Sequence, residues 1–254
     1  MNLKKLVFIS LLAISLASYS QKNWVITKET SVKISIDSTS DKIADKNYIT
    51  YLEPLKQQLG AKMNVIIGQA SETMRGHSPE SLLSNWNADV YLQAGSAFLG
   101  LPVDISVVNL GGLRTVIPEG NITVGKIFEL MPFENELVIL WLKGDKLAEL
   151  IQFFAKVGGE GVSGIRMEIN NGKAVNVTIN GQPIDAEKIY TIATSDYLAG
   201  GNDKMVQLAQ YEKRVNTNIK LRDILLDYVK KETAKGNKIQ SKLDGRIKLQ
   251  VTLK

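Results

Sequence analysis

The chain has 254 residues, of which 44% are hydrophobic and 22% charged, fractions typical of a globular protein with a substantial core. The formal net charge is +5, and without Lys4 and Lys5 of the N-terminal stretch 29 basic residues stand against 26 acidic ones. This mild basicity, without a Lys/Arg block, argues against nucleic acid as a partner. The absence of cysteine excludes disulfides, thiolate nucleophiles and cysteine-ligated metals.

The N-terminus has the three parts of a secretory signal peptide. Lys4 and Lys5 provide a basic start, Leu6–Ala17 forms an apolar run, and small residues follow up to Gln21. We expect cleavage after Ser20 and an exported mature protein, periplasmic or secreted. The apolar run is short for a membrane span, and a lipidated bacterial anchor would need a cysteine. We therefore expect neither a stable membrane anchor nor lipidation.

After the signal peptide of residues 1–20, we expect an N-terminal extension over residues 21–42 and one domain over residues 43–254. Some segments alternate apolar and polar residues with the period of a strand, and Asn-Gly pairs mark hairpin turns. Strands are predicted at Trp24–Thr27, Val32–Ile36, Asn64–Gly68, Asp104–Val108, Glu136–Leu142, Ile165–Ile169, Ala174–Ile179, Lys188–Ala193 and Arg246–Val251, with turns at Asn171–Gly172 and Asn180–Gly181.

Other segments repeat apolar residues with the period of a helix. Helices are predicted at Asp45–Leu59, from Ser78 to Val90, at Ile122–Leu130, from Asp145 to Phe154 and from Ile219 to Val229. Ser78, Thr123 and Asp145 are the expected N-caps, and Gly60 and Gly158 the expected helix ends. Because helices and strands are interspersed and hairpins are frequent, the sequence predicts an α+β fold with a mixed sheet and flanking helices.

The segment Asn109–Arg114 follows a buried strand and contains two adjacent glycines, Gly111 and Gly112. Glycines permit a sharp turn with positive φ and a close approach of the backbone. Exposed loop N–H groups and the guanidinium of Arg114 could together bind an anion such as a carboxylate or phosphate. The alternative is an ordinary turn with Arg114 in a surface ion pair.

Four motifs follow one another in the chain: Asn109–Arg114, Pro132–Asn135, Leu142–Gly144 and Tyr197–Asp203. In this order they resemble the C-terminal, substrate-binding domain of the 5'-nucleotidase family, whose pattern is roughly N-x-G-G-x-R, P-F-x-N, L-x-G and [FY]-L-A-x-G-G-D. Each motif is weak alone, but four in order at plausible spacing are fairly specific. The resemblance extends from about Ile43 to Arg246 and implies the mixed-sheet fold of that domain.

The resemblance also implies a nucleotide or nucleoside ligand. Phe133 and Tyr197 would stack on the two faces of the base, and Asp203 would bind the ribose hydroxyls. Asn135 and Asn109 match contacts near the base and the phosphate, and Gly164, after Ser163, matches the family's close-approach glycine. The full set of implied substrate-binding residues is Asn109, Gly111, Gly112, Arg114, Phe133, Asn135, Gly164, Tyr197, Gly201 and Asp203. The alternatives are core packing for Phe133 and Tyr197, and a plain turn for Asp203.

This sequence departs from the family pattern at two places. Many relatives have an arginine for the phosphate just before the position of Glu80, whereas here the nearest basic groups are Arg75 and His77. The second glycine of the last motif is Asn202, a residue that tolerates left-handed backbone better than most. His77, the single histidine, stands in a polar loop, where it could be surface decoration or a substrate contact.

The resemblance implies that catalysis in this family depends on two metal ions held by a metallophosphoesterase domain with Asp-x-His and Gly-Asn-His elements. The sequence contains neither element, and a two-metal site needs several converging imidazoles and carboxylates. We expect no catalytic residue, metal ligand or cofactor in this chain, and divalent metals only in a separately encoded metallophosphoesterase partner. Two other hypotheses stay open: a free-standing nucleoside- or nucleotide-binding protein, and a structural or interaction domain that has lost its site.

Overall fold

The structure is a computed structural model that describes residues 26–35, 37 and 45–250. Its contacts divide the chain into two units, Met1–Tyr51 and Leu52–Lys254, which we describe separately. The expected signal peptide lies outside the described residues. Among these residues, no helix combines the length and apolarity needed to cross a membrane.

In the first unit, the expected strands at Trp24–Thr27 and Val32–Ile36 are wrong wherever residues are described: 26–27 and 32–35 have no regular secondary structure. Ile26, Val32 and Ile34 are each more than 80% exposed. A strand is stable only when a neighbouring strand takes its backbone hydrogen bonds. No described strand pairs with these residues, so apolar alternation alone did not produce a strand.

The helix α2 (Lys46–Met63) contains the boundary between the units and has Pro54 inside it. None of its residues is buried. The expected end at Gly60 is wrong, because the helix continues to Met63.

The three sheets of the described residues all belong to the second unit, and they include parallel and antiparallel pairs, which confirms the predicted α+β class with a mixed sheet. The five-stranded sheet has the order β10-β4-β9-β2-β5, the four-stranded sheet β11-β6-β7-β8, and the small sheet β1-β3. The strands are β1 (Ile66–Ala70), β2 (Ile105–Val108), β3 (Gly120–Thr123), β4 (Glu136–Lys143), β5 (Gly161–Ser163), β6 (Ile165–Asn170), β7 (Lys173–Ile179), β8 (Gln182–Pro183), β9 (Ile189–Ser195), β10 (Lys213–Lys220) and β11 (Ile247–Leu249).

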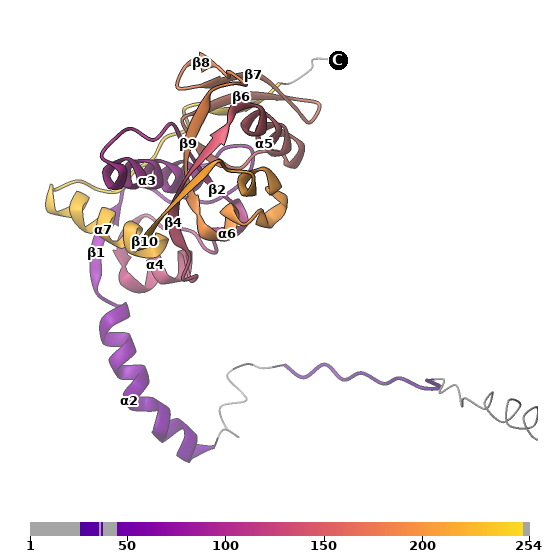
Figure 1. The fold of residues 1–254 in the computed structure, drawn as a ribbon. Helices are drawn as coiled ribbons and strands as arrows, with labels where there is room; N and C mark the ends of the chain where they lie inside the picture. Colours follow the sequence, from indigo (N-terminus) through magenta and orange to yellow (C-terminus); the bar gives the residue numbers. More distant parts are fainter. Residues whose placement is uncertain (1–25, 36, 38–44, 251–254) are drawn as a thin grey trace, which may run out of the picture. The chain divides into compact units, whose positions relative to one another are not determined.

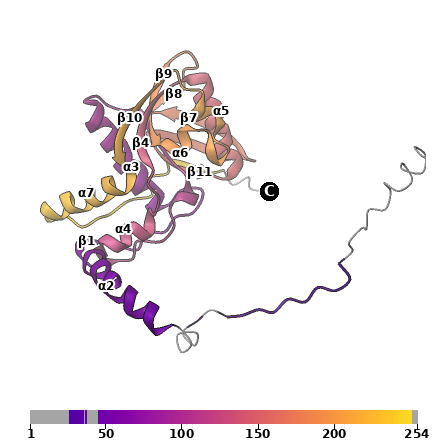
Figure 2. The ribbon, with the colours of Figure 1, turned by 60° about the horizontal axis from the view of Figure 1, so that its bottom comes forward.

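Helices cover both faces of the five-stranded sheet, with α3 and α7 on one side and α5 on the other (Figures 1 and 2). The helices of this unit are α3 (Leu82–Leu99), α4 (Val124–Leu130), α5 (Gly144–Val157), α6 (Asp196–Ala199) and α7 (Leu221–Ala234), with 3₁₀ turns η2 (Leu110–Gly112), η3 (Asn202–Lys204) and η4 (Val206–Ala209).

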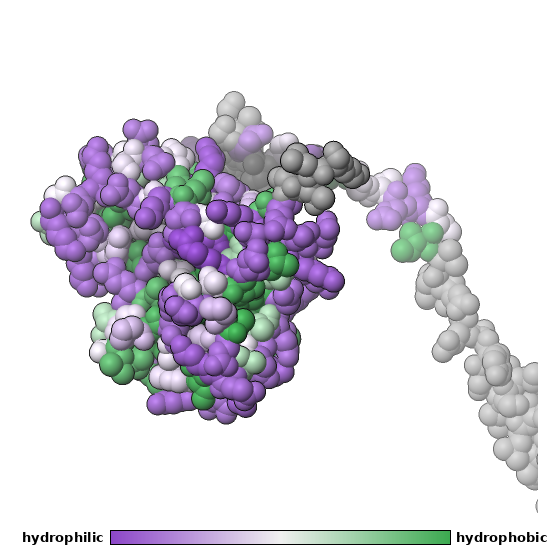
Figure 3. All heavy atoms as spheres, turned by 90° about the horizontal axis from the view of Figure 1, so that it is seen from above, coloured by the Kyte–Doolittle hydropathy of each residue, from purple (hydrophilic) through white to green (hydrophobic). Residues whose placement is uncertain are grey.

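Two hydrophobic clusters fill the two sides of this sheet. Leu137 and Ile139 of β4 pack into the cluster with α3 and α7, whereas Val138 and Leu140 pack into the cluster with α5. The unbroken apolar run of β4 is the pattern expected of a strand buried on both faces. The four-stranded sheet packs on the α5 side of the five-stranded sheet. Seen from above, the surface carries mainly hydrophilic side chains with small hydrophobic patches (Figure 3).

The predicted helix ends are partly right. Thr123 caps α4 by accepting a hydrogen bond from the Lys126 N–H, and the left-handed Gly158 ends α5, both as predicted. The expected cap Asp145 is wrong, since it lies inside the first turn of α5.

The predicted start of α3 at Ser78 is also wrong. The helix begins after Ser81, which forms a reciprocal capping box with Ser84. Glu80 is buried and stays outside the helix, because its carboxylate accepts bonds from the Asn85 amide and from the backbone of Asp244.

Candidate ligand-binding site

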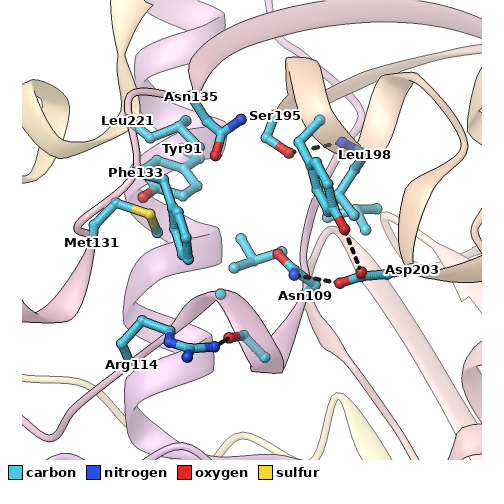
Figure 4. Close-up of a pocket in the computed structure, with 15 residues that line it drawn as sticks. Tyr91, Asn109, Arg114, Met131, Phe133, Asn135, Ser195, Leu198, Asp203 and Leu221 are labelled. Carbon is cyan, nitrogen blue, oxygen red and sulfur yellow. Dashed lines mark hydrogen bonds between the residues drawn. The ribbon is translucent and has the colours of Figure 1, made fainter.

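A cavity of about 340 Å³ opens at the ends of the central strands β2, β4 and β9 (Figure 4). We call it the ligand cavity. Its lining residues are Tyr91, Val107, Val108, Asn109, Gly111, Gly112, Arg114, Met131, Phe133, Asn135, Ser195, Tyr197, Leu198, Asp203 and Leu221. Eight of the ten residues singled out in the sequence are among them, and they come from three separate loops.

The first loop, Asn109–Arg114, leaves the end of β2 through the turn η2. Neither Gly111 nor Gly112 uses the positive φ that glycine permits. Gly112 instead leaves space for Asn109: a Cβ there would lie 2.7 Å from Asn109 Oδ1 and push this side chain aside. Arg114 donates to the Gly111 carbonyl over 3.1 Å, and its guanidinium lies 5.8 Å from the centre of the Phe133 ring.

The second loop, Pro132–Asn135, joins α4 to β4 and is held by α7. The Leu221 N–H donates to the Asn135 carbonyl over 2.9 Å. The buried Arg222 forms an ion pair with Glu134 and donates to the Phe133 carbonyl. These bonds fix the backbone on both sides of Phe133 and leave this residue 40% exposed beside the cavity.

The third loop, Tyr197–Asp203, follows the end of β9. The Tyr197 hydroxyl donates to Asp203 Oδ1 over 2.8 Å, and the Asn109 amide donates to Asp203 Oδ2 over 2.6 Å. The hydrogen bond to Asp203 raises the pKa of the Tyr197 phenol. Figure 4 shows Asp203 and Phe133 on opposite sides of the cavity, with Asn109 close to Asp203. The carboxylate therefore ties the first loop to the third.

The left-handed backbone in this loop falls on Gly201 and Asp203, and it continues at Lys204 just after the loop. Asn202, whose residue type tolerates left-handed backbone, does not have a positive φ here. Asn202 instead donates its side-chain amide to the Tyr197 carbonyl over 2.7 Å, which closes the loop behind the tyrosine. Gly201 does not line the cavity, but its positive φ of 80° lets the loop turn toward Asp203.

Gly164 also lies away from the ligand cavity. It borders a second, polar pocket together with Arg246. A Cβ on Gly164 would lie 2.2 Å from the Asp104 carbonyl oxygen, so its close approach is to the protein backbone. Arg75 and His77 are exposed and do not line the ligand cavity, so neither takes the place of the family arginine there.

Glu160 lies behind the first loop. Its carboxylate accepts a hydrogen bond from the Leu110 N–H over 2.8 Å. Burial raises the pKa of this carboxyl to about 7, and the negative charge of Asp203 adds to the rise while the Leu110 bond opposes it. A mostly buried acid therefore supports the loop that holds Asn109.

Sequence reasoning missed several cavity residues, because their types are typical of any core. The missed lining residues are Tyr91, Val107, Val108, Met131, Ser195, Leu198 and Leu221. Tyr91 is the least ordinary of them, since its buried hydroxyl has no partner among the described residues.

A phosphoesterase metal pair would need several converging ligands, and the described residues do not provide them. They contain no group of three or more His, Cys, Asp or Glu side chains placed to hold a metal ion. The residues therefore do not fit such a pair, and we assign no chemical step to one here.

The comparisons with known proteins agree with this fold. The family described as 5'-nucleotidase, C-terminal domain, matches residues 61–210. Protein UshA of Yersinia enterocolitica is 30% identical over 213 residues, covering 78% of this chain and 38% of its own length. A 5'-nucleotidase of Vibrio parahaemolyticus is 24% identical over 214 residues, covering 78% of this chain and 37% of its own length. The chain thus spans less than half the length of these curated relatives.

Among solved structures, the 5'-nucleotidase precursor from Thermus thermophilus superposes with a TM-score of 0.69 at 27% identity, covering 82% of this chain and 43% of that one. The NAD nucleotidase of Haemophilus influenzae has the same fold, with a TM-score of 0.60 at 22% identity, covering 82% of this chain and 42% of that one. With more than half of its residues matched by the family, the chain belongs to the 5'-nucleotidase C-terminal domain family.

Proposed function

We propose that this domain binds a nucleoside or nucleotide in the ligand cavity. The observation that carries the proposal is the pairing of an exposed aromatic ring, Phe133, with a carboxylate, Asp203, across one cavity (Figure 4). An aromatic ring offers a flat apolar surface for any base. A carboxylate accepts hydrogen bonds from vicinal hydroxyls such as those of ribose. Tyr197, bonded to Asp203, supplies a second ring beside the carboxylate.

Arg114 adds a positive charge to the same cavity. Its guanidinium can bind a phosphate through two parallel hydrogen bonds; in the structure it donates to the Gly111 carbonyl and lies over the Phe133 ring. The proposal therefore includes nucleoside monophosphates as ligands.

We further propose that the domain supplies substrate recognition to a metallophosphoesterase on a separate chain, outside the cytoplasm and after cleavage at Ser20. Two proteins that resemble this chain are named 5'-nucleotidases, and the chain matches only part of their length. Co-purification of a metallophosphoesterase with the tagged chain would support this pairing. Mass spectrometry of the mature N-terminus would test export, with a chain beginning at Gln21 as the expected result.

Binding itself can be tested by titration calorimetry of the purified chain with adenosine and AMP. Stacking on an aromatic ring is worth about 1–3 kcal/mol per base, so Phe133→Ala should weaken adenosine binding by roughly 5- to 150-fold. Phe98→Ala is the matched control, because Phe98 is 44% exposed, close to the 40% of Phe133, and does not line the cavity. Equal losses in both variants, or no heat with the unaltered chain, would contradict a base-binding cavity and favour a domain that has lost its site.

A further inference from the structure

The side chain of Asp196 links two of the three loops of the ligand cavity. Asp196 is the first residue of α6, directly after the end of β9. One of its oxygens, Oδ1, accepts three hydrogen bonds: from Asn135 Nδ2 over 2.8 Å, from the Glu136 N–H over 3.2 Å and from the Tyr197 N–H over 2.8 Å. The same atom therefore holds the second loop, the start of β4 and the third loop.

These bonds follow from the sheet register. β4 and β9 are antiparallel neighbours with Leu137 opposite Ser195, so the residues just outside this pair, Glu136 and Asp196, meet where the ladder ends. Asp196 does not line the cavity. It acts on the ligand only through Asn135 and Tyr197, which do.

The bond to Asp196 decides which end of the Asn135 amide faces the ligand. An ionised carboxylate only accepts hydrogen bonds, so the amide nitrogen of Asn135 must turn toward Asp196. The amide oxygen then points the other way. Figure 4 shows the Asn135 nitrogen on the side of Ser195 and the oxygen turned toward the space beside Phe133. No described residue donates a hydrogen bond to this oxygen.

We infer that Asp196 is a positioning residue that fixes Asn135 as a hydrogen-bond acceptor, so that the cavity prefers bases presenting an N–H donor, such as the exocyclic amino group of adenine or cytosine. The inference rests on the proposed function and adds the chemical class of the base. Some bases carry only hydrogen-bond acceptors on the edge that faces Asn135. The ring nitrogen of such a base then meets the Asn135 oxygen, and neither atom supplies a proton for a hydrogen bond. Sites built to bond a donor discriminate against analogues that lack it.

The test compares adenosine with purine riboside, which differs only in lacking the 6-amino group. The unaltered chain should bind adenosine about tenfold more tightly, the effect of one hydrogen bond. In Asp196→Ala the Asn135 amide is free to turn over, and the ratio of the two affinities should fall to within about twofold of one. Asp196→Asn keeps an accepting oxygen, so this conservative variant should retain most of the ratio.

Asp145→Ala is the matched control. Asp145 also lies in the first turn of a helix and also accepts the N–H of the next residue, Lys146 over 2.7 Å, but it does not line or support the cavity. The ratio of adenosine affinity to purine riboside affinity in Asp145→Ala should equal the ratio in the unaltered chain. If Asp196→Ala does not fold, Asn135→Ala replaces it and should lose the ratio in the same way.

The outcomes separate the inference from the proposed function. Equal affinities for the two nucleosides in the unaltered chain, or an unchanged ratio in Asp196→Ala or Asn135→Ala, would overturn the inference while leaving a nucleoside-binding cavity in place. Failure of the unaltered chain to bind either nucleoside would instead overturn the proposed function on which the inference rests.

Discussion

The two sides of the ligand cavity are held in different ways. The Phe133 side is fixed from behind, by backbone hydrogen bonds to α7 and by the buried Arg222. On the opposite side, the bonds of Asp203 to Tyr197 and Asn109 lie in the cavity itself. A ligand can replace bonds within the cavity but not those behind it. The first side is therefore a rigid surface for an apolar group, and the second a polar surface that can exchange partners.

The largest effect we expect concerns Glu160, which supports the polar side. Its folded-state pKa of about 7 lies above the ordinary 4.5, so the folded state binds the proton more tightly than the unfolded chain. The contribution of this group to stability is then lost as the pH rises from 4.5 to 7, by up to about 3 kcal/mol.

The variant Glu160→Gln cannot ionise, so its stability relative to the unaltered chain should increase over that pH window and stay constant above it. Urea unfolding at pH 4.5, 6 and 8 measures this difference. If the difference in unfolding free energy between the two chains does not change with pH, the pKa of Glu160 is not raised by folding.

The second prediction concerns Arg222 and the apolar side. Its side chain is 7% exposed, pairs with Glu134 and lies 4.1 Å from the centre of the Phe128 ring. Arg222→Ala removes this packing together with the ion pair, and we expect a loss of about 2 kcal/mol in the free energy of unfolding.

Arg75→Ala provides the control for Arg222→Ala, because Arg75 is exposed and its truncation should cost less than about 0.5 kcal/mol. Thermal unfolding of both variants measures the contrast. Equal melting temperatures would mean that the apolar side is not fixed by α7.

The smallest effect should come from Tyr197→Phe, which keeps the ring and removes the bond to Asp203. If the polar side exchanges partners with the ligand, the lost bond weakens adenosine binding only about two- to fivefold, well below the effect of removing the Phe133 ring. Calorimetry measures both. If Tyr197→Phe weakened adenosine binding as much as Phe133→Ala does, the proposed difference between a rigid apolar side and an exchangeable polar side would be contradicted.

Much of the site was predictable because its residues stand in short motifs at strand ends. Asn109 follows β2 and Tyr197 follows β9, and these strands are parallel neighbours, so both loops leave the same edge of the sheet. The motifs therefore located eight of the fifteen lining residues without any knowledge of the core. They did not locate Asp196 or Glu160, because acidic residues that support a loop from behind have no characteristic spacing.

Two further misses have physical causes. The strand β10 is rich in polar residues, and its alternation is too weak to predict a strand, yet it pairs with β4 through its backbone at the edge of the sheet. The left-handed backbone falls on Asp203 and not Asn202, because the Asn202 side chain is bonded to the Tyr197 carbonyl. In β10, tertiary backbone hydrogen bonds outweighed local preference.

The most direct test of a base-binding cavity between Phe133 and Asp203 is an experimental structure of the chain with adenosine. We expect the purine ring stacked on Phe133, and both ribose hydroxyls within hydrogen-bond distance of Asp203 after its present partners have moved aside. Adenosine bound elsewhere on the chain, with this cavity unchanged, would contradict the account.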